Sequence, residues 1–226
     1  MSKLVCIAIV LVAWCCALSM YRFYVKKIQK EQAGMVIILN GPSAAGKSSI
    51  QKELQRLMMP TLWIKLGIDN LFDAPMPDIT LENMSYWQNE NSIRWVTMSK
   101  DNDDNQIMTL FVGDQGDKVA YGMNSAIAAY AQSGCNIVVD YIAYKKEWID
   151  DLRRKLKDVK TYWVKVTISL SALEEREAAR ATSPKGHARS HYDTVYWNIK
   201  YDLEVDSEKN SALVIAQQIR DFLAKK

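Results

Sequence analysis

Cysteine and histidine are scarce in this chain of 226 residues, and their scarcity excludes two classes of protein. Of the four cysteines, Cys6, Cys15 and Cys16 lie near the N-terminus, which leaves only Cys135 for the rest of the sequence. A disulfide framework is therefore excluded there, and a reducing compartment is favoured. The two histidines have no cysteine near them in the sequence, so a zinc site would lack most of its usual ligands.

Excess basic charge is also missing from most of the chain, although the formal net charge is +3. Residues 1–33 carry five basic residues and one acidic residue, which leaves 24 basic and 25 acidic residues in 34–226. This balance provides no electrostatic footprint for a nucleic acid, so we predict no such partner. The sequence also has no N-K-x-D motif, which argues against a GTPase.

One long apolar run stands at the N-terminus, from Leu4 to Met20, without a charged residue. Seventeen residues is about the lower limit for a membrane-spanning helix, and aromatic and basic residues follow at Tyr21–Lys27. We predict that 1–33 is a membrane anchor with a basic flank and that 34–226 is a folded domain in the cytoplasm. A cleaved signal peptide, with export of the domain, is the alternative.

Short β-branched runs alternate with longer helical patterns through 34–226, which predicts an α/β fold with a parallel sheet flanked by helices. The expected strands are 35–39, 61–66, 136–139, 162–168 and 201–205. The expected helices are 48–57, 116–133, 145–156, 171–180 and 211–224.

The pattern changes between the second and third expected strands. Two alternating runs, Ser92–Met98 and Gln106–Val112, surround the polar stretch Asp101–Asn105 and predict an inserted β-hairpin. The polar stretch lacks the glycine and the terminal glutamate of a calcium loop, so we interpret it as a solvated hairpin tip.

A phosphate-binding motif, G-x-x-x-x-G-K-[ST], joins the first expected strand to the first expected helix. Its glycines let successive backbone N–H groups point at phosphate, and the helix N-terminus favours the same anion. Lys47 is expected to reach the β- and γ-phosphates of ATP, and the Ser48 hydroxyl to bind Mg²⁺. The alternative is a glycine-rich turn with an exposed lysine. The residues predicted to bind the nucleotide are Gly41, Pro42, Ser43, Ala44, Ala45, Gly46, Lys47, Ser48 and Ser49.

A second Mg²⁺ ligand is expected at the carboxyl end of another buried strand, where ligands gather in open α/β sheets. Asp140 directly follows the apolar run Asn136–Val139 and fits this role. An aspartate in this position is also a common helix cap, and the sequence leaves that alternative open.

Five blocks of the sequence together resemble the chloramphenicol phosphotransferase-like family of P-loop kinases. The blocks are Ile38–Ser49, Gly67–Asn70, Ile137–Asp140, Glu175–Arg180 and Tyr201–Asp206. The resemblance extends over about residues 35–220 and implies a P-loop, nucleotide-kinase-like fold for the domain 34–226. It also implies O-phosphorylation, with Asp69 as the general base that accepts the proton of the substrate hydroxyl.

The same resemblance implies a lid of arginines over the phosphates. Arg176 and Arg180 match this lid, whereas the second arginine that usually follows is absent, so Lys185 or Arg189 could supply further charge. Each of these positions also has a plainer interpretation. The arginines could pair with Glu174, Glu175 and Glu177 along a solvated helix face.

The remaining residues around the expected site have similar alternatives. Asp69 could be a turn residue, but Trp63 and Phe72 lie near it in the sequence and could line an apolar pocket. His187 and His191 follow the lid in a polar stretch and are expected at the surface.

These observations predict an ATP-dependent and Mg²⁺-dependent O-phosphotransferase that acts on a small hydroxylated molecule. One alternative is a nucleotide-binding regulatory protein at the membrane. Another is a toxin-like kinase that acts on a nucleotide sugar, which would share the phosphate-binding motif and differ in the substrate pocket.

Overall fold

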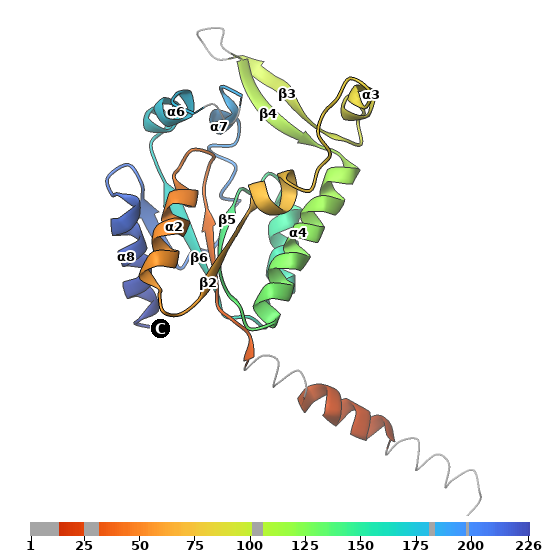
Figure 1. Cartoon of the computed structure of the whole chain (residues 1–226), viewed down its shortest axis with the longest axis vertical. Coiled ribbons are helices and arrows are strands. Elements are labelled where there is room, and N and C mark those ends of the chain that lie inside the picture. The colour runs from red at the N-terminus through yellow and green to blue at the C-terminus, as the bar shows by residue number, and fades with distance from the viewer. Residues whose placement is uncertain (1–13, 25–31, 101–105, 181–183, 198) are drawn as a thin grey trace, which may run out of the picture.

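A computed structural model describes residues 14–24, 32–100, 106–180, 184–197 and 199–226. Its centre is a five-stranded sheet with the strand order β2-β5-β1-β6-β7 (Figure 1). All of its neighbouring strands are parallel. In sheet order, the strands are β2 (Trp63–Gly67), β5 (Asn136–Tyr141), β1 (Val36–Asn40), β6 (Thr161–Thr167) and β7 (Leu203–Asp206).

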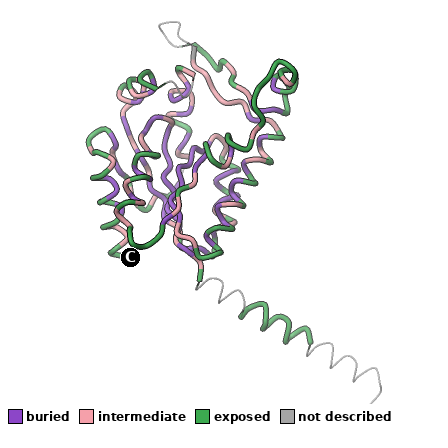
Figure 2. The backbone as a smooth tube through the Cα atoms, in the orientation of Figure 1, coloured by how far each residue is buried: buried purple, intermediate pink, exposed green. Residues whose placement is uncertain are grey.

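Helices cover both faces of this sheet, because the strand side chains alternate between two apolar clusters. Ile37 and Leu39 of β1 pack in the cluster that includes α2 (Lys47–Leu57) and α8 (Ala212–Leu223). Val36 and Ile38 belong to the other cluster, with α4 (Asp114–Gln132) and α5 (Lys146–Lys155). Figure 2 shows the resulting buried centre between exposed helix surfaces. The predicted parallel α/β fold is therefore confirmed.

The predicted hairpin is also present, as β3 (Ile93–Lys100) and β4 (Gln106–Val112) in an antiparallel sheet of their own. It stands beyond the carboxyl edge of the parallel sheet, where β4 contacts α4 and α7 (His187–Ser190) (Figure 1). The tip, predicted at Asp101–Asn105, lies outside the described residues.

Shorter helices that the sequence patterns did not predict lie at the same edge. A π-helix, η1 (Asp69–Asp73), begins two residues after the end of β2, and α3 (Met84–Trp87) precedes the hairpin. The helix α6 (Leu170–Ala178), which was predicted at 171–180, follows β6 and contacts α7. Parallel strands all end at the same edge of a sheet, so the residues that follow β1, β2 and β5 lie together at the carboxyl edge.

The predicted membrane anchor is corrected by the structure. Part of the run Leu4–Met20 lies outside the described residues, and residues 14–24 form a helix. No helix in the described part of the chain is long and apolar enough to cross a membrane. The prediction of a membrane-anchored chain with its folded domain in the cytoplasm was therefore wrong.

Candidate functional site

The loop between β1 and α2 has the backbone shape of an anion-binding nest. Ala44 and Gly46 adopt left-handed conformations, with φ of 63° and 86°. A Cβ on Gly41 would lie 2.5 Å from the Val166 carbonyl oxygen, so this position requires glycine. The first N–H groups of a helix lack acceptors within the helix, and those at the start of α2 can receive phosphate oxygens together with the loop.

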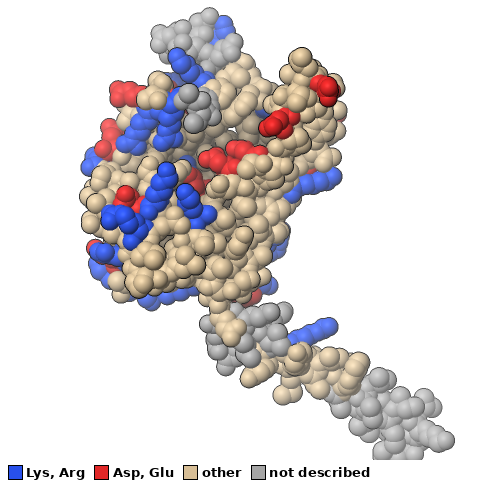
Figure 3. Space-filling model, in the orientation of Figure 1, with Lys and Arg blue, Asp and Glu red and all other residues tan. Residues whose placement is uncertain are grey.

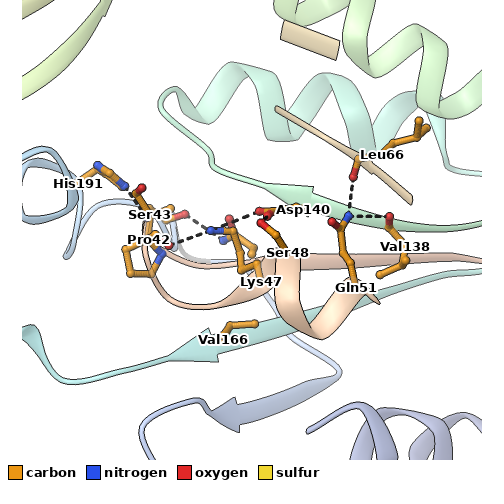
Figure 4. Close-up of polar contacts among 12 residues, drawn as sticks. Pro42, Ser43, Lys47, Ser48, Gln51, Leu66, Val138, Asp140, Val166 and His191 are labelled. Atoms are coloured by element: carbon orange, nitrogen blue, oxygen red, sulfur yellow. Dashed lines mark hydrogen bonds and ion pairs between the residues drawn. The ribbon is translucent and has the colours of Figure 1, made fainter. Parts of the chain in front are cut away.

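Three polar side chains meet at this loop (Figure 4). Lys47 is only 4% exposed, and its Nζ donates a 2.8 Å hydrogen bond to the Pro42 carbonyl. The same Nζ lies 3.4 Å from Asp140 Oδ1. The Ser48 hydroxyl donates to Asp140 Oδ2 at 2.6 Å. The loop lysine, the hydroxyl and the strand-end carboxylate are thus brought together as the sequence predicted.

A buried glutamine fixes the helix that carries these residues. Gln51 Nε2 donates to the carbonyls of Leu66 in β2 and Val138 in β5, at 2.7 and 3.0 Å (Figure 4). These two bonds hold α2 against β2, which precedes Asp69, and against β5, which contains Asp140. The sequence analysis did not single out this residue, because a Gln within a helix pattern carries no signal of its own.

The Ser48 and Asp140 oxygens have the chemistry of a Mg²⁺ site. Asp140 Oδ1 is buried and accepts no hydrogen bond from the described residues. Magnesium is typically bound through one or two carboxylates together with substrate phosphates, rather than by a cage of protein ligands. The described residues contain no group of three or more His, Cys, Asp or Glu side chains that could hold a metal. The two predicted ligands therefore fit Mg²⁺ held jointly with a phosphate.

Asp69 is the first residue of η1, two positions after the end of β2, and lines the same cavity as Lys47, Ser48 and Asp140. Burial raises the pKa of Asp69 above its ordinary value of 3.8, and the negative charge of Asp140 raises it further. Lys47 and Arg180 act in the opposite direction. Asp73, at the end of η1, lines the cavity too, and burial together with Asp69 raises its pKa to about 6.

The cavity is about 1070 Å³ in volume and extends from the phosphate-binding loop to the hairpin. A pocket for a single drug-sized ligand is typically about 300–1,000 Å³, so this cavity has room for nucleotide phosphates and a second molecule. Figure 3 shows acidic side chains gathered at the hollow of this face and basic ones beside it. The wall away from the loop is mostly apolar, formed by Ile68, Phe72, Met76, Ile79, Met84, Trp87, Ile93, Trp95, Leu110 and Ile142.

The two predicted lid arginines occupy different positions. Arg176 lies beside the loop, with its Nη1 3.7 Å from where a Gly46 Cβ would be, and its Nη2 donates to the Ser207 carbonyl at 2.7 Å. Arg180 lines the large cavity and also a second one of about 260 Å³ on the other side of Gly46. Arg189 instead forms an ion pair with Glu174.

Three expectations about aromatic side chains near the site change with the structure. His187 and His191, expected at the surface, are only 3% and 4% exposed. The reason is that the chain after α6 folds back over the phosphate-binding loop, a contact between segments far apart in the sequence. Trp63 faces the cluster under α2, away from the cavity, whereas Phe72 lines the cavity as expected.

The phosphate-binding loop joins a strand to a helix at the carboxyl edge of a parallel sheet. This arrangement defines a P-loop kinase fold. The family described as chloramphenicol phosphotransferase-like protein matches residues 34–224. The chain belongs to this family, and it is a kinase.

The comparisons with individual proteins agree with this assignment. The Mycobacterium tuberculosis protein named "Putative O-phosphotransferase Rv2636" is 25% identical over 191 residues, which cover 83% of this chain and 81% of that protein. Solved structures of two kinases share the fold. The M. tuberculosis APS kinase CysC, in complex with AMPPNP and APS, has 18% identity and a TM-score of 0.56, covering 85% of this chain and 98% of its own. Shikimate kinase from Acinetobacter baumannii has 13% identity and a TM-score of 0.52, covering 85% and 94%.

Proposed function

We propose that this kinase transfers the γ-phosphoryl group of ATP to a hydroxyl of a small molecule. The observation that carries the proposal is a single cavity lined by Lys47, Ser48 and Asp140 at one part and by Asp69 at another. This shared cavity supports Asp69 as the base, because an acceptor hydroxyl in the cavity could contact Asp69 and the transferring phosphate together. The O-phosphotransferase name of the M. tuberculosis relative supports the same reaction class.

The phosphate-binding loop and Lys47 would hold and orient the phosphates. Lys47 is fixed by the Pro42 carbonyl and by Asp140, so its charge is positioned before the nucleotide binds. Positioning and charge neutralisation are the main contributions of a protein to phosphoryl transfer. Ser48 and Asp140 would hold Mg²⁺, which when bound neutralises charge on the β- and γ-phosphates. Arg176 and Arg180 would add positive charge on the other side of the loop.

Asp69 would act as the general base in this scheme. The acceptor oxygen forms a bond to the γ-phosphorus while the bond from that phosphorus to the β,γ-bridging oxygen breaks and ADP leaves. The proton of the acceptor hydroxyl passes to the Asp69 carboxylate. A raised pKa makes this carboxylate a stronger proton acceptor, and the effect is useful as long as the group remains ionised near neutral pH.

The two cavities suggest how the ligands divide the site. The smaller one lies between α2 and the loop before α8 and is lined by Arg176, Asn210 and Ala212 among others, which suits the base end of the nucleotide. The far part of the larger one suits an acceptor with an apolar body, because its wall is largely aliphatic and aromatic. Asp69 and Asp73 are the carboxylates that such an acceptor would meet on η1.

The test is a screen of purified protein for acceptor-dependent ADP release with Mg²⁺ and ATP, with Lys47→Ala as the inactive control. The panel contains hydroxylated antibiotics, sugars, apolar alcohols and nucleotide sugars, and mass spectrometry identifies the phosphorylated product. A phosphorylated small alcohol, absent with the control variant, supports the proposal. Phosphorylation of nucleotide sugars alone would show that the protein is a nucleotide-sugar kinase instead. Binding of ATP without any phosphorylated product from the panel would contradict the proposal.

A further inference from the structure

Two buried histidines lie over the phosphate-binding loop on a segment that is tied firmly to α6. The buried Glu177 carboxylate accepts the backbone N–H groups of Gly186 and Ala188, at 2.7 and 2.6 Å. These bonds fix the start of α7 relative to α6. The residues that follow, up to His191, are therefore held in a defined position above β1 and the loop.

His191 makes a direct hydrogen bond to the loop. The Ser43 backbone N–H donates to His191 Nε2 at 3.0 Å (Figure 4). This geometry requires Nε2 to carry a lone pair, so the imidazole is neutral with its proton on Nδ1, which lies 3.4 Å from the Ser190 hydroxyl. Burial, the neighbouring His187 and the Lys47 charge all lower the pKa of His191, which keeps the ring in this neutral form.

The bonded residue immediately precedes a strained part of the loop. Ala44 adopts φ of 63°, a conformation that is uncommon for residues other than glycine. Such conformations persist only where surrounding contacts hold them in place. The bond from Ser43 to His191 is a contact of this kind, because it fixes the peptide group between Pro42 and Ser43, one residue before Ala44.

The same ring also belongs to an aromatic stack that reaches the far part of the cavity. The His191 ring centroid lies 4.7 Å from that of His187, whose Nε2 is 2.9 Å from the Tyr144 hydroxyl. Trp95 of the hairpin packs its ring against His187 with centroids 4.6 Å apart. Tyr144, His187 and Trp95 line the large cavity. His191 is thus packed from the side opposite to the loop as well.

We propose that His191 is a positioning residue, which acts through Ser43 to hold the phosphate-binding loop in its phosphate-accepting shape. The inference rests on the proposed function in so far as the loop receives the phosphates of a nucleotide. Loss of the bond leaves the Ser43 N–H without its buried acceptor and relaxes the support of Ala44. Nucleotide affinity then falls even though no group that would touch the nucleotide has been removed.

The experiment compares variants of the full chain that keep or delete the acceptor atom. His191→Gln can place an amide oxygen near the position of Nε2, whereas His191→Met fills similar space without an acceptor. His191→Asn is too short to reach Ser43 and provides a second bond-deleting variant in case His191→Met does not fold. Folding of each variant is verified by thermal melting and far-UV circular dichroism. The readout is the dissociation constant for AMPPNP with Mg²⁺, measured by calorimetry. No hydroxylated substrate is added.

We expect the bond-deleting variants to bind AMPPNP about 5- to 20-fold more weakly, and His191→Gln to stay within about threefold of the original chain, because loss of a partly buried hydrogen bond has effects of this order. Equal losses in His191→Gln and His191→Met would indicate packing alone and overturn the proposal, as would unchanged affinity in all variants. If the original chain itself does not bind AMPPNP, the proposed function fails. If it binds and His191→Met binds equally well, only this inference fails.

Discussion

Substitution of Asp69 by asparagine tests the chemistry of the proposed site most directly. The exchange preserves the shape of the side chain but removes the negative charge and the basic lone pair. A positioned general base typically contributes about 10² to 10⁴ in rate, which corresponds to about 3 to 5 kcal/mol of barrier. We therefore expect the transfer rate of Asp69→Asn to fall by that factor. ATP affinity should change little, because Lys47, Ser48 and the loop backbone remain in place.

The structure supplies a matched control for this substitution on the same short helix. Asp73 lines the same cavity and belongs to η1 as well, but Asp69 is the first residue of η1, and its pKa responds to the charges of Lys47 and Asp140. Asp73→Asn makes the same chemical change without removing the proposed base. We expect a transfer rate within about fivefold of that of the original chain. The substitution removes a negative charge near the site but leaves the group that accepts the proton.

The pH dependence of transfer distinguishes the two carboxylates further. Asp69 must be ionised to accept a proton, so kcat/KM should rise with pH through a pKa above 3.8. Burial and the charge of Asp140 raise the pKa of Asp69, and both remain in Asp73→Asn. The acid limb of the profile should therefore keep its position in Asp73→Asn and disappear in the residual activity of Asp69→Asn.

The assay measures single-turnover transfer at saturating ATP, with an acceptor identified by the screen, beside the ATP dissociation constant of each variant. A loss of less than about threefold in Asp69→Asn, with normal ATP binding, would refute the assignment of Asp69 as the base. Equal decreases of the transfer rate in Asp69→Asn and Asp73→Asn would show that the effect comes from the total negative charge of η1 and not from a base at Asp69.

Three further predictions concern the loop and its support. Lys47→Ala should abolish ATP turnover, because it removes the buried cation that would follow the transferring phosphoryl group, and turnover at the original rate would show that the loop is structural. Ser48→Ala should raise the Mg²⁺ concentration needed for half-maximal turnover by about tenfold or more, and an unchanged Mg²⁺ titration would exclude Ser48 as a ligand. Glu177→Gln should lower Tm by about 2 to 8 °C, because the backbone N–H of either Gly186 or the buried Ala188 loses its carboxylate acceptor, and an unchanged melting curve would contradict this support of α7.

The sequence alone predicted the parallel sheet and the phosphate-binding loop because both depend on local patterns. The strand Val36–Asn40 is apolar from Val36 to Leu39 because both faces of the sheet are covered. The loop motif has fixed spacing between strand and helix. The strand-end position of Asp140 was predictable for the same reason, since parallel strands end at one edge. The roles of Lys47, Ser48, Asp69 and Asp140 stay predictions that the experiments above test.

Only the tertiary structure decided the features that depend on long-range contacts. Residues Ser43 and His191 are separated by 148 positions, so no local pattern indicated their hydrogen bond or the burial of the imidazole. The side chain of Trp63 faces the cluster that includes α2, because that face of β2 packs against α2. The apolar run at the N-terminus was overinterpreted, because hydropathy alone does not establish a membrane-spanning helix. A strand or a loop motif is determined by neighbours along the chain, whereas a buried polar contact between distant segments is determined by how the whole fold brings them together.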